Sequence, residues 1–503
     1  MGSRAALAAP AARAFGELRA LLAAQLAGDE EATRLLNTPD WAAAMSRAAA
    51  LKRRLECPAG LRAAVGLAED KPTAGTPPDA ADGDGGEPAA ETAPDAADGG
   101  GGEPAAFLRL AQRVWDGACV REEQIADPAL RAWRRRQIAR CDGQLARANA
   151  RGLLHAPVAF ELSSGCSRHC WFCSMAAAPL TDVFGYTSQN ARLWREVLAV
   201  VGDVVGPAAA KGGCYWATEP FDNPDYERFA GDFHEVLGEF PQTTTAMALA
   251  DPARTRALLD LSLRRGAPRN RFSVLSVPML RRLYRELTPQ ELLLVHLVLH
   301  VEGGTRRFEA GRAREPHGVA LSAASPARPG TSACLSGFLI SMTERRVSLL
   351  SPCPADERRP HGSIVFAEER FDGADDLGRS LRRMIAEHMP PTWPAGSPVG
   401  LRADVVCAYA DGRLELTAAH ATHCVKGDAS LRTLGELVTA GRHDLDGLAA
   451  RMYWHGWSER QVRRTVDLLL ANGLLDETTG AVAGPTPTRR SFGADAGADR
   501  GAG

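Results

Sequence analysis

Hydrophobic positions along the chain follow two spacings, one typical of strands and one typical of helices. Between residues 155 and 365, apolar runs of strand length alternate with amphipathic stretches, which is the pattern of a β/α domain with parallel strands. In one such stretch, Trp194, Val197 and Val201 fall on a single helical face. The six strand–helix units predict an α/β fold, a partial (β/α)6 barrel within residues 155–390. The predicted strands are 158–163, 213–218, 243–249, 272–276, 294–301 and 337–342.

Helical spacing precedes this region. An Ala-, Leu- and Arg-rich pattern over residues 1–70 predicts a helical N-terminal region, and a second helical pattern over 107–154 leads into the barrel. The second pattern contains the basic run RAWRRRQIAR at residues 131–140. No aromatic platform for stacking on bases accompanies it, so we expect a solvated helix face rather than a nucleic-acid patch.

Two segments lack hydrophobic periodicity. Residues 71–106 contain PDAADGDGGEPAA, which is nearly repeated as PDAADGGGGEPAA, and residues 478–503 are rich in Gly, Ala, Thr and Pro. Neither segment has enough apolar side chains to offset the chain entropy lost on folding. We therefore predict a disordered linker and a disordered tail.

Residues 400–477 read as a small separate unit. The strand-like run VVCAYADGRLEL is followed by helical patterns, and the last helix begins with a capping-box pair, Ser458 and Gln461, and ends near Gly473. This order favours a winged-helix-like domain. Its arginines are balanced by acidic residues, so we prefer a module that binds a peptide leader along a sheet edge to a DNA-binding module. A structural cap on the barrel is the alternative.

Composition argues against a nucleic-acid-binding protein and a membrane protein. Among 503 residues, Lys+Arg 59 and Asp+Glu 61 give a net charge of −2, so no global field attracts nucleic acid or an anionic membrane. No apolar stretch approaches the ~18 residues of a membrane span, and the N-terminus has no signal-peptide core. We expect a cytoplasmic protein whose 11 cysteines are thiols, metal ligands or catalytic groups rather than disulfides.

The strongest chemical signal is ELSSGCSRHCWFCSM, directly after the first predicted strand. It places Cys166, Cys170 and Cys173 within one loop, and thiolates are preferred ligands of iron–sulfur clusters. Three ligands leave the fourth iron of a [4Fe-4S] cube open for another molecule. A zinc site completed by His169 or Cys214 is the alternative, and three buried structural thiols are another.

This C-x3-C-x2-C pattern, with aromatic Phe172 before its last cysteine, resembles the signature of the radical S-adenosylmethionine (SAM) superfamily. The resemblance implies that Cys166, Cys170 and Cys173 hold a [4Fe-4S] cluster that binds and cleaves SAM. It also implies that Phe172 lies near the adenine and that an electron donor such as flavodoxin or ferredoxin is a partner.

A second passage, KGGCYWATEPFDNPDY at residues 211–226, is similar to the superfamily's GGEP segment. By that resemblance Glu219 accepts a hydrogen bond from the SAM amino group and Thr218 assists. The GGE tripeptide itself is replaced by Ala-Thr-Glu. Ser273 and Ser276, at the end of a later predicted strand, are further candidates for SAM contacts.

Residues 107–477 more narrowly resemble the proteusin-type radical SAM peptide epimerases. Members of that family convert L- to D-residues in a ribosomally made precursor peptide. A deoxyadenosyl radical abstracts the Cα hydrogen, and a cysteine thiol returns a hydrogen from the opposite face. Cys353 is the first choice for this donor because prolines flank it, and Cys334 is the second. The passages that carry the resemblance are GCSRHCWFC, YWATEPFDNPDY, the segment 333–362 and the C-terminal unit.

Two other functions stay open. A radical SAM maturase that crosslinks the peptide or forms C–C bonds is one. A noncatalytic iron–sulfur or zinc scaffold that binds the peptide is the other. Only Cys407 and Cys424 lie beyond residue 400, without a C-x2-C pair, so we expect one cluster and no auxiliary cluster.

Overall fold

The computed structural model describes most of the chain from residue 120 to residue 477. The described residues are 19, 30–37, 41–57, 59–62, 65, 106, 108 and 120–477 without 267–269, 294, 302–307 and 316–327. The predicted linker, apart from Ala106, and the predicted tail lie outside them, as does much of the predicted N-terminal region.

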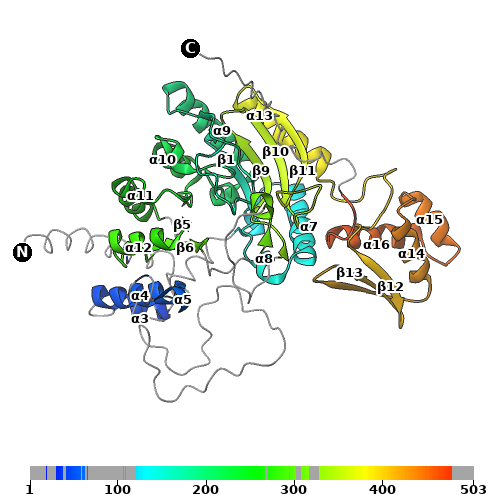
Figure 1. The fold of residues 1–503 in the computed structure, drawn as a ribbon. Helices are drawn as coiled ribbons and strands as arrows, with labels where there is room; N and C mark the ends of the chain where they lie inside the picture. The colour runs from blue at the N-terminus through cyan, green and yellow to red at the C-terminus, as the bar shows by residue number, and fades with distance from the viewer. Residues whose placement is uncertain are drawn as a thin grey trace, which may run out of the picture.

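The larger sheet has four strands in the order β1–β9–β10–β11. β1 pairs with β9 in parallel, whereas β9, β10 and β11 are antiparallel neighbours. Helices α9, α10 and α13 pack on one face of this sheet (Figure 1) and share a hydrophobic core with it. The elements are β1 (Ala156–Glu161), β9 (Leu335–Ser341), β10 (Arg346–Pro352), β11 (Ser363–Arg370), α9 (Ser188–Val205), α10 (Tyr226–Leu237) and α13 (Ala374–His388).

A second sheet consists of three parallel strands, β4–β5–β6, joined through helices. Side chains alternate along β5: Phe272 and Val274 pack in the core beside α12, whereas Arg271 and Ser273 line a cavity. The two sheets and the helices that pack on them confirm the predicted α/β class. The elements are β4 (Thr244–Thr245), β5 (Asn270–Val274), β6 (Val295–Leu299), α11 (Pro252–Arg264) and α12 (Val277–Glu286).

The predicted strands are reproduced unevenly. Segment 213–218 forms only a single bridge, between Gly213 and Ala159, and the strand predicted over 243–249 is reduced to Thr244–Thr245. A side chain on Gly212 would clash with Val158 of β1, so this stretch passes β1 too closely to carry a regular strand. Strands β10 and β11 were not predicted. The remaining predicted strands overlap β1, β5, β6 and β9.

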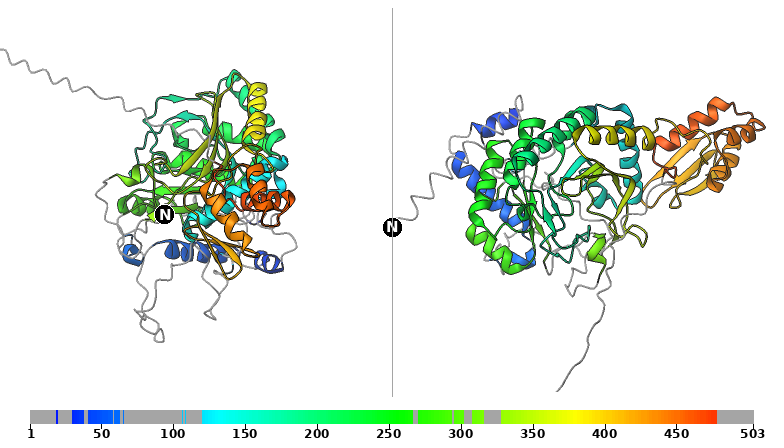
Figure 2. Two further views of the ribbon diagram at one scale, coloured as in Figure 1. Left: turned by 90° about the vertical axis from the view of Figure 1, so that its right-hand side faces the viewer. Right: turned by 90° about the horizontal axis from the view of Figure 1, so that it is seen from above.

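The N-terminal helices lie beside β6 and α12 (Figures 1 and 2). Lys52 Nζ donates hydrogen bonds to the carbonyls of Leu292 and Val295, the latter at 2.7 Å. The Arg53 guanidinium stacks 3.9 Å from the centre of the Tyr284 ring. The N-terminal helices, although far from β6 in sequence, therefore cover the side of the domain where β6 lies. These helices are α3 (Glu30–Leu36), α4 (Trp41–Glu56) and α5 (Ala59–Arg62).

The C-terminal unit forms a lobe on the opposite side, next to α7 (Figures 1 and 2). Three antiparallel strands precede three helices, and both layers share their own hydrophobic core. The capping box of Ser458 and Gln461 is confirmed. The winged-helix interpretation stays a prediction. The elements are β12 (Val406–Ala410), β13 (Arg413–Thr417), β14 (Thr422–Lys426), α14 (Ser430–Ala440), α15 (Leu445–Tyr453) and α16 (Glu459–Ala471).

The basic run on α7 (Pro128–Gln144) is not a solvated face, contrary to the expectation. Arg134, Arg136 and Arg140 are buried. Arg140 donates to the Pro352 carbonyl at 2.7 Å, and Arg136 donates to the Glu477 carboxylate at 2.9 Å. Their acceptors come from distant parts of the chain, so these arginines join the large sheet, α7 and the C-terminal lobe.

Several shorter elements complete the described structure. No helix in the described part of the chain is long and apolar enough to cross a membrane. The short elements are η2 (Glu122–Gln124), α8 (Arg147–Arg151), β2 (Ser163–Ser164), β3 (Asp182–Val183), η3 (Pro207–Lys211), η4 (Pro220–Asp222), β7 (Phe308–Glu309), η5 (Gly311–Arg314) and β8 (Arg328–Pro329).

Candidate active site at the cysteine loop

The three cysteines lie on a loop that leaves β1 and is closed at its base by pairing of β2 with β3. The backbone N–H of Cys166 donates to the Ala178 carbonyl at 2.9 Å. Gly165 has a φ of +80°, and a Cβ there would lie under 3.0 Å from the backbone oxygen of Pro179. Only glycine fits this conformation and this close approach, so Gly165 fixes how the loop turns back on itself.

Arg312, on η5, holds the loop from the other side. Its backbone N–H donates to the Cys173 carbonyl at 2.9 Å. Its guanidinium donates to the Cys170 carbonyl at 3.0 Å and to the Ala177 carbonyl at 2.7 Å. Two of these three acceptors are the carbonyls of predicted ligand cysteines, so Arg312 sets the positions of both.

The loop opens into a cavity of about 660 Å³. This volume lies within the range of sites that hold a small molecule or cofactor. Both sheets contribute walls, because the cavity lies between β1 on one side and β4–β6 on the other. Its lining includes Cys166, Cys170, Cys173, Phe172, Thr218, Glu219, Ser273, His300 and Cys334.

The chemistry of the three sulfurs suits a cluster. Burial raises the pKa of Cys166 and of Cys170 to about 11, so both are neutral thiols that a bound metal would have to deprotonate. The Cys173 sulfur lies close enough to influence both. The Arg168 N–H donates to the Cys166 sulfur at 3.4 Å. This hydrogen bond opposes the effect of burial, because it favours the thiolate form of Cys166.

Among the described residues, no group of three or more His, Cys, Asp or Glu side chains is arranged to hold a single metal ion. The ligands of a cube bind three different irons, so their sulfurs need not converge on one point. The three cysteines lie on one loop and line one cavity, so they could bind three irons of a cubic cluster.

Phe172 forms a flat stack with His300, whose ring centre lies 3.3 Å away at an interplanar angle of 1°. His300 directly follows β6. Burial, reinforced by the Arg271 guanidinium, lowers the pKa of His300 to about 3, so the imidazole is neutral at physiological pH. The stack joins the cysteine loop to the carboxyl end of β6.

Glu219 is buried beside the cavity and accepts three hydrogen bonds from the chain. The Thr245 hydroxyl and the Phe221 N–H donate to Oε1, and the Ala246 N–H donates to Oε2 at 2.8 Å. Burial raises its pKa, although these donors counteract the shift. A carboxylate has about four acceptor positions, so one remains for a donor in the cavity.

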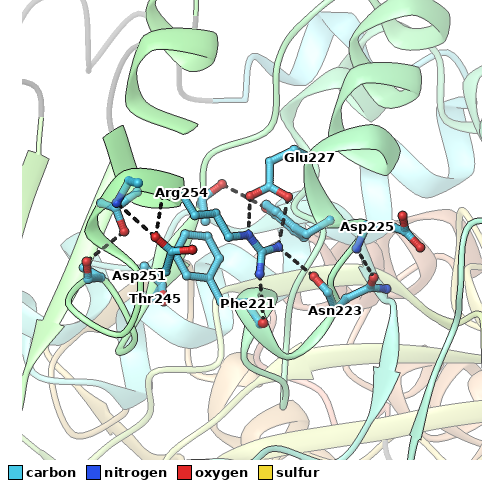
Figure 3. Close-up of polar contacts among 12 residues, drawn as sticks. Phe221, Asn223, Asp225, Glu227, Thr245, Asp251 and Arg254 are labelled. Atoms are coloured by element: carbon cyan, nitrogen blue, oxygen red, sulfur yellow. Dashed lines mark hydrogen bonds and ion pairs between the residues drawn. The ribbon is translucent and has the colours of Figure 1, made fainter. Parts of the chain in front are cut away.

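The loop after Glu219 is held rigidly (Figure 3). Arg254 donates to both oxygens of Glu227, at 2.7 and 2.9 Å, and also to the carbonyls of Phe221 and Asn223. The Asp222 carboxylate in turn accepts the Ser167 N–H at 2.8 Å. Asp222 therefore connects the segment that follows Glu219 to the cysteine loop.

The other predicted cofactor contacts divide into two groups. Thr218 and Ser273 line the cavity. Ser276 instead caps α12, where its hydroxyl accepts the Met279 N–H at 3.2 Å, and it is not among the described residues that line the cavity. The geometry gives no support for Ser276 as a SAM contact.

The two donor candidates differ sharply in position. Cys353, the first choice, is 1% exposed and packs in the hydrophobic core, and it is not among the cavity-lining residues. Burial raises its pKa to about 11. Cys334, the second choice, is partly buried and lines the same cavity as the cluster cysteines. The geometry reverses the predicted order.

The cavity also contains polar residues that the sequence analysis did not select, namely Arg271, His296 and Glu56. His296 lies inside the predicted apolar strand 294–301, and Arg271 lies directly before the predicted strand 272–276, so a polar residue within or beside an apolar run was a usable signal. Glu56 comes from α4, and its sequence carried no comparable signal.

Comparison with known proteins gives one clear relationship. The chain is 38% identical over 360 residues, 70% of each chain, to a Sinorhizobium fredii (strain NBRC 101917 / NGR234) protein described as "Uncharacterized protein y4wI". No protein-family model matches the chain. No solved structure matches it either.

Proposed function

The chain belongs to the family of the Sinorhizobium fredii protein y4wI, and we propose that it is a radical SAM enzyme that epimerises L- to D-residues in a ribosomally made precursor peptide. The observation that carries the proposal is the loop of Cys166, Cys170 and Cys173, clamped by Arg312 at the wall of a cavity of about 660 Å³. This cavity is large enough for a cofactor and a segment of substrate.

Cys166, Cys170 and Cys173 would hold a [4Fe-4S] cluster by three of its irons. When bound and reduced, by a donor such as ferredoxin or flavodoxin, the cluster supplies the electron that cleaves SAM to methionine and a 5′-deoxyadenosyl radical. The remaining acceptor position of Glu219 suits the SAM ammonium, and Thr218 and Ser273 offer hydroxyls along the same wall. The arrangement of the parallel strands β4–β6 opposite β1, with the cavity between them, is what supports a partial radical SAM barrel.

Cys334 is the residue we assign as hydrogen donor. After a Cα–H bond of the peptide has been broken, the S–H bond of Cys334 breaks and a C–H bond forms on the opposite face of Cα. The sulfur radical that remains is reduced by one electron from the external electron donor, and the resulting thiolate takes one proton from solvent. The partly buried thiol at the cavity wall satisfies the need for access to the peptide.

The C-terminal lobe would bind the leader of the precursor. Strands β12 and β14 are the two edges of its sheet, and a peptide adds to such an edge through main-chain hydrogen bonds.

The proposal is tested by anaerobic reconstitution with iron and sulfide, followed by reduction in the presence of SAM. We expect about four irons per chain and release of 5′-deoxyadenosine. Replacing Cys166, Cys170 or Cys173 by serine should abolish both, whereas replacing the exposed Cys424 on β14 should leave both unchanged. A wild-type protein that binds iron but never cleaves SAM would refute the proposal.

A further inference from the structure

A second polar site lies in the same cavity, toward the amino ends of β5 and β6. His300, directly after β6, stacks on Phe172 of that loop, so the loop meets the carboxyl ends of the strands. Arg271 is the second residue of β5 and pairs in register with His296 of β6. It therefore lies near the opposite, amino ends of the strands and still lines the cavity.

The Arg271 side chain has no partner in the part of the chain that the structure describes. Its Nε is buried without a hydrogen bond. Both carboxylates that line this end of the cavity already pair with lysines: Glu56 with Lys52 at 2.6 Å and Glu239 with Lys211 at 2.7 Å. No carboxylate among the described residues at this end pairs with the Arg271 guanidinium, which is partly buried, so the guanidinium is available to pair with an anionic ligand.

A second observation points to the same ligand. Gln242, which lies two residues before β4, lines the cavity, and its Nε2 is also buried without a hydrogen bond. Thr244 of β4 pairs in register with Arg271, so Gln242 and Arg271 belong to adjacent strands at the same end. Each side chain thus has one buried nitrogen without an acceptor, and because one of the two side chains is cationic, the pair favours an anionic acceptor.

We propose that Arg271 and Gln242 form an anion subsite that binds a carboxylate of the substrate. The planar guanidinium and the amide both donate in the directions that a carboxylate accepts. That this carboxylate belongs to a peptide, as an acidic side chain or a C-terminus, rests on the proposed function. The subsite would hold the peptide at one end of the cavity while another residue lies beside the cysteine loop.

The test compares how tightly two probes bind to the full chain, N-acetyl-glutamate α-amide and N-acetyl-glutamine α-amide. The two have the same shape and blocked termini, and they differ only in the charge of the side chain. Trp171 and Trp216 line the cavity, so their fluorescence reports binding. We expect the glutamate probe to bind at least about tenfold more tightly and Arg271→Met to remove this preference. Gln242→Ala should reduce the preference. Arg192→Met, at an exposed arginine of α9, is the matched control and should retain it.

A structural role for Arg271 is separated by the melting temperature without ligand. Arg271→Met should melt no lower than wild type, because no hydrogen bond or ion pair between the Arg271 side chain and the described part of the chain is lost. The inference is overturned by equal binding of the two probes, by a preference that survives Arg271→Met, or by a variant that melts lower. Loss of SAM binding in Arg271→Met would also overturn it. A wild type that prefers the glutamate probe but never cleaves SAM would refute the proposed function and leave the subsite standing.

Discussion

Replacing Gly165 by alanine is the sharpest test of the cysteine loop's geometry. The new Cβ would meet backbone atoms of Pro179 and Ala178 at under 3.0 Å, and the backbone φ is +80°. An alanine in this conformation costs about 1–2 kcal/mol. Relief of the clash requires the loop to separate, which breaks the Cys166 N–H hydrogen bond to the Ala178 carbonyl at a further cost of about 1 kcal/mol. We expect about 3 kcal/mol of local destabilisation in all.

Hydrogen exchange of the loop amides measures this cost directly. Protection of the Cys166 amide should fall about 100-fold in Gly165→Ala, since about 3 kcal/mol of local opening free energy is lost. Gly185→Ala is the matched control, because its Cβ would meet nothing within 4 Å and its φ is not positive. Equal protection of the Cys166 amide in the two variants would show that Gly165 does not fix the conformation of the cysteine loop. Iron uptake after reconstitution should follow the same order, with Gly165→Ala the lower.

Three further predictions follow from particular side chains. Arg312→Gln loses the two guanidinium hydrogen bonds to the Cys170 and Ala177 carbonyls, which costs about 2 kcal/mol of loop stability at this partly exposed position. The iron content and the electron paramagnetic resonance spectrum of the reduced protein should both change. Wild-type values of both would show that Arg312 does not hold the loop. Cys334→Ala should keep SAM cleavage but no longer incorporate hydrogen from solvent into the peptide. Cys353→Ala, in the core, should lower the melting temperature and still incorporate that hydrogen. The reverse pattern would indicate that Cys353 is the donor. Burial raises the pKa of Glu161 from 4.5 to about 7, so its contribution to stability is complete below about pH 4 and is lost as the pH rises to about 7. Glu161→Gln should therefore gain up to about 3 kcal/mol over wild type at pH 8, and melting curves from pH 4 to 8 with parallel pH dependence would contradict this.

The cysteine loop was predictable because its signal is local. The spacing of Cys166, Cys170 and Cys173 alone predicts a cluster loop, and no long-range contact has to be known for this prediction. The alternation of apolar runs and helical stripes likewise predicted the α/β class. Strands β1, β5, β6 and β9 were found because each is an apolar run of ordinary strand length.

Other features depend on contacts between distant segments. The turn between β9 and β10 places Arg345 at a φ of +50° without the glycine or asparagine that usually marks such a hairpin, so β10 was missed. The three buried arginines of α7 satisfy carbonyls and carboxylates from far along the chain, which a local charge pattern does not show. Flanking prolines suggested a fixed loop for Cys353 but not the direction of its thiol, which packs into the core.

The central claim, peptide epimerisation, is tested most directly in D₂O. The reconstituted protein would be incubated with SAM, a reductant and a precursor peptide, to be sought in short reading frames beside the gene. The mass of the peptide and the chirality of its residues would then be measured. We expect a gain of about one mass unit for each residue converted to the D-form, because the donor thiol exchanges its hydrogen with solvent. A loss of about two mass units, or release of 5′-deoxyadenosine with no deuterium in the peptide, would contradict it.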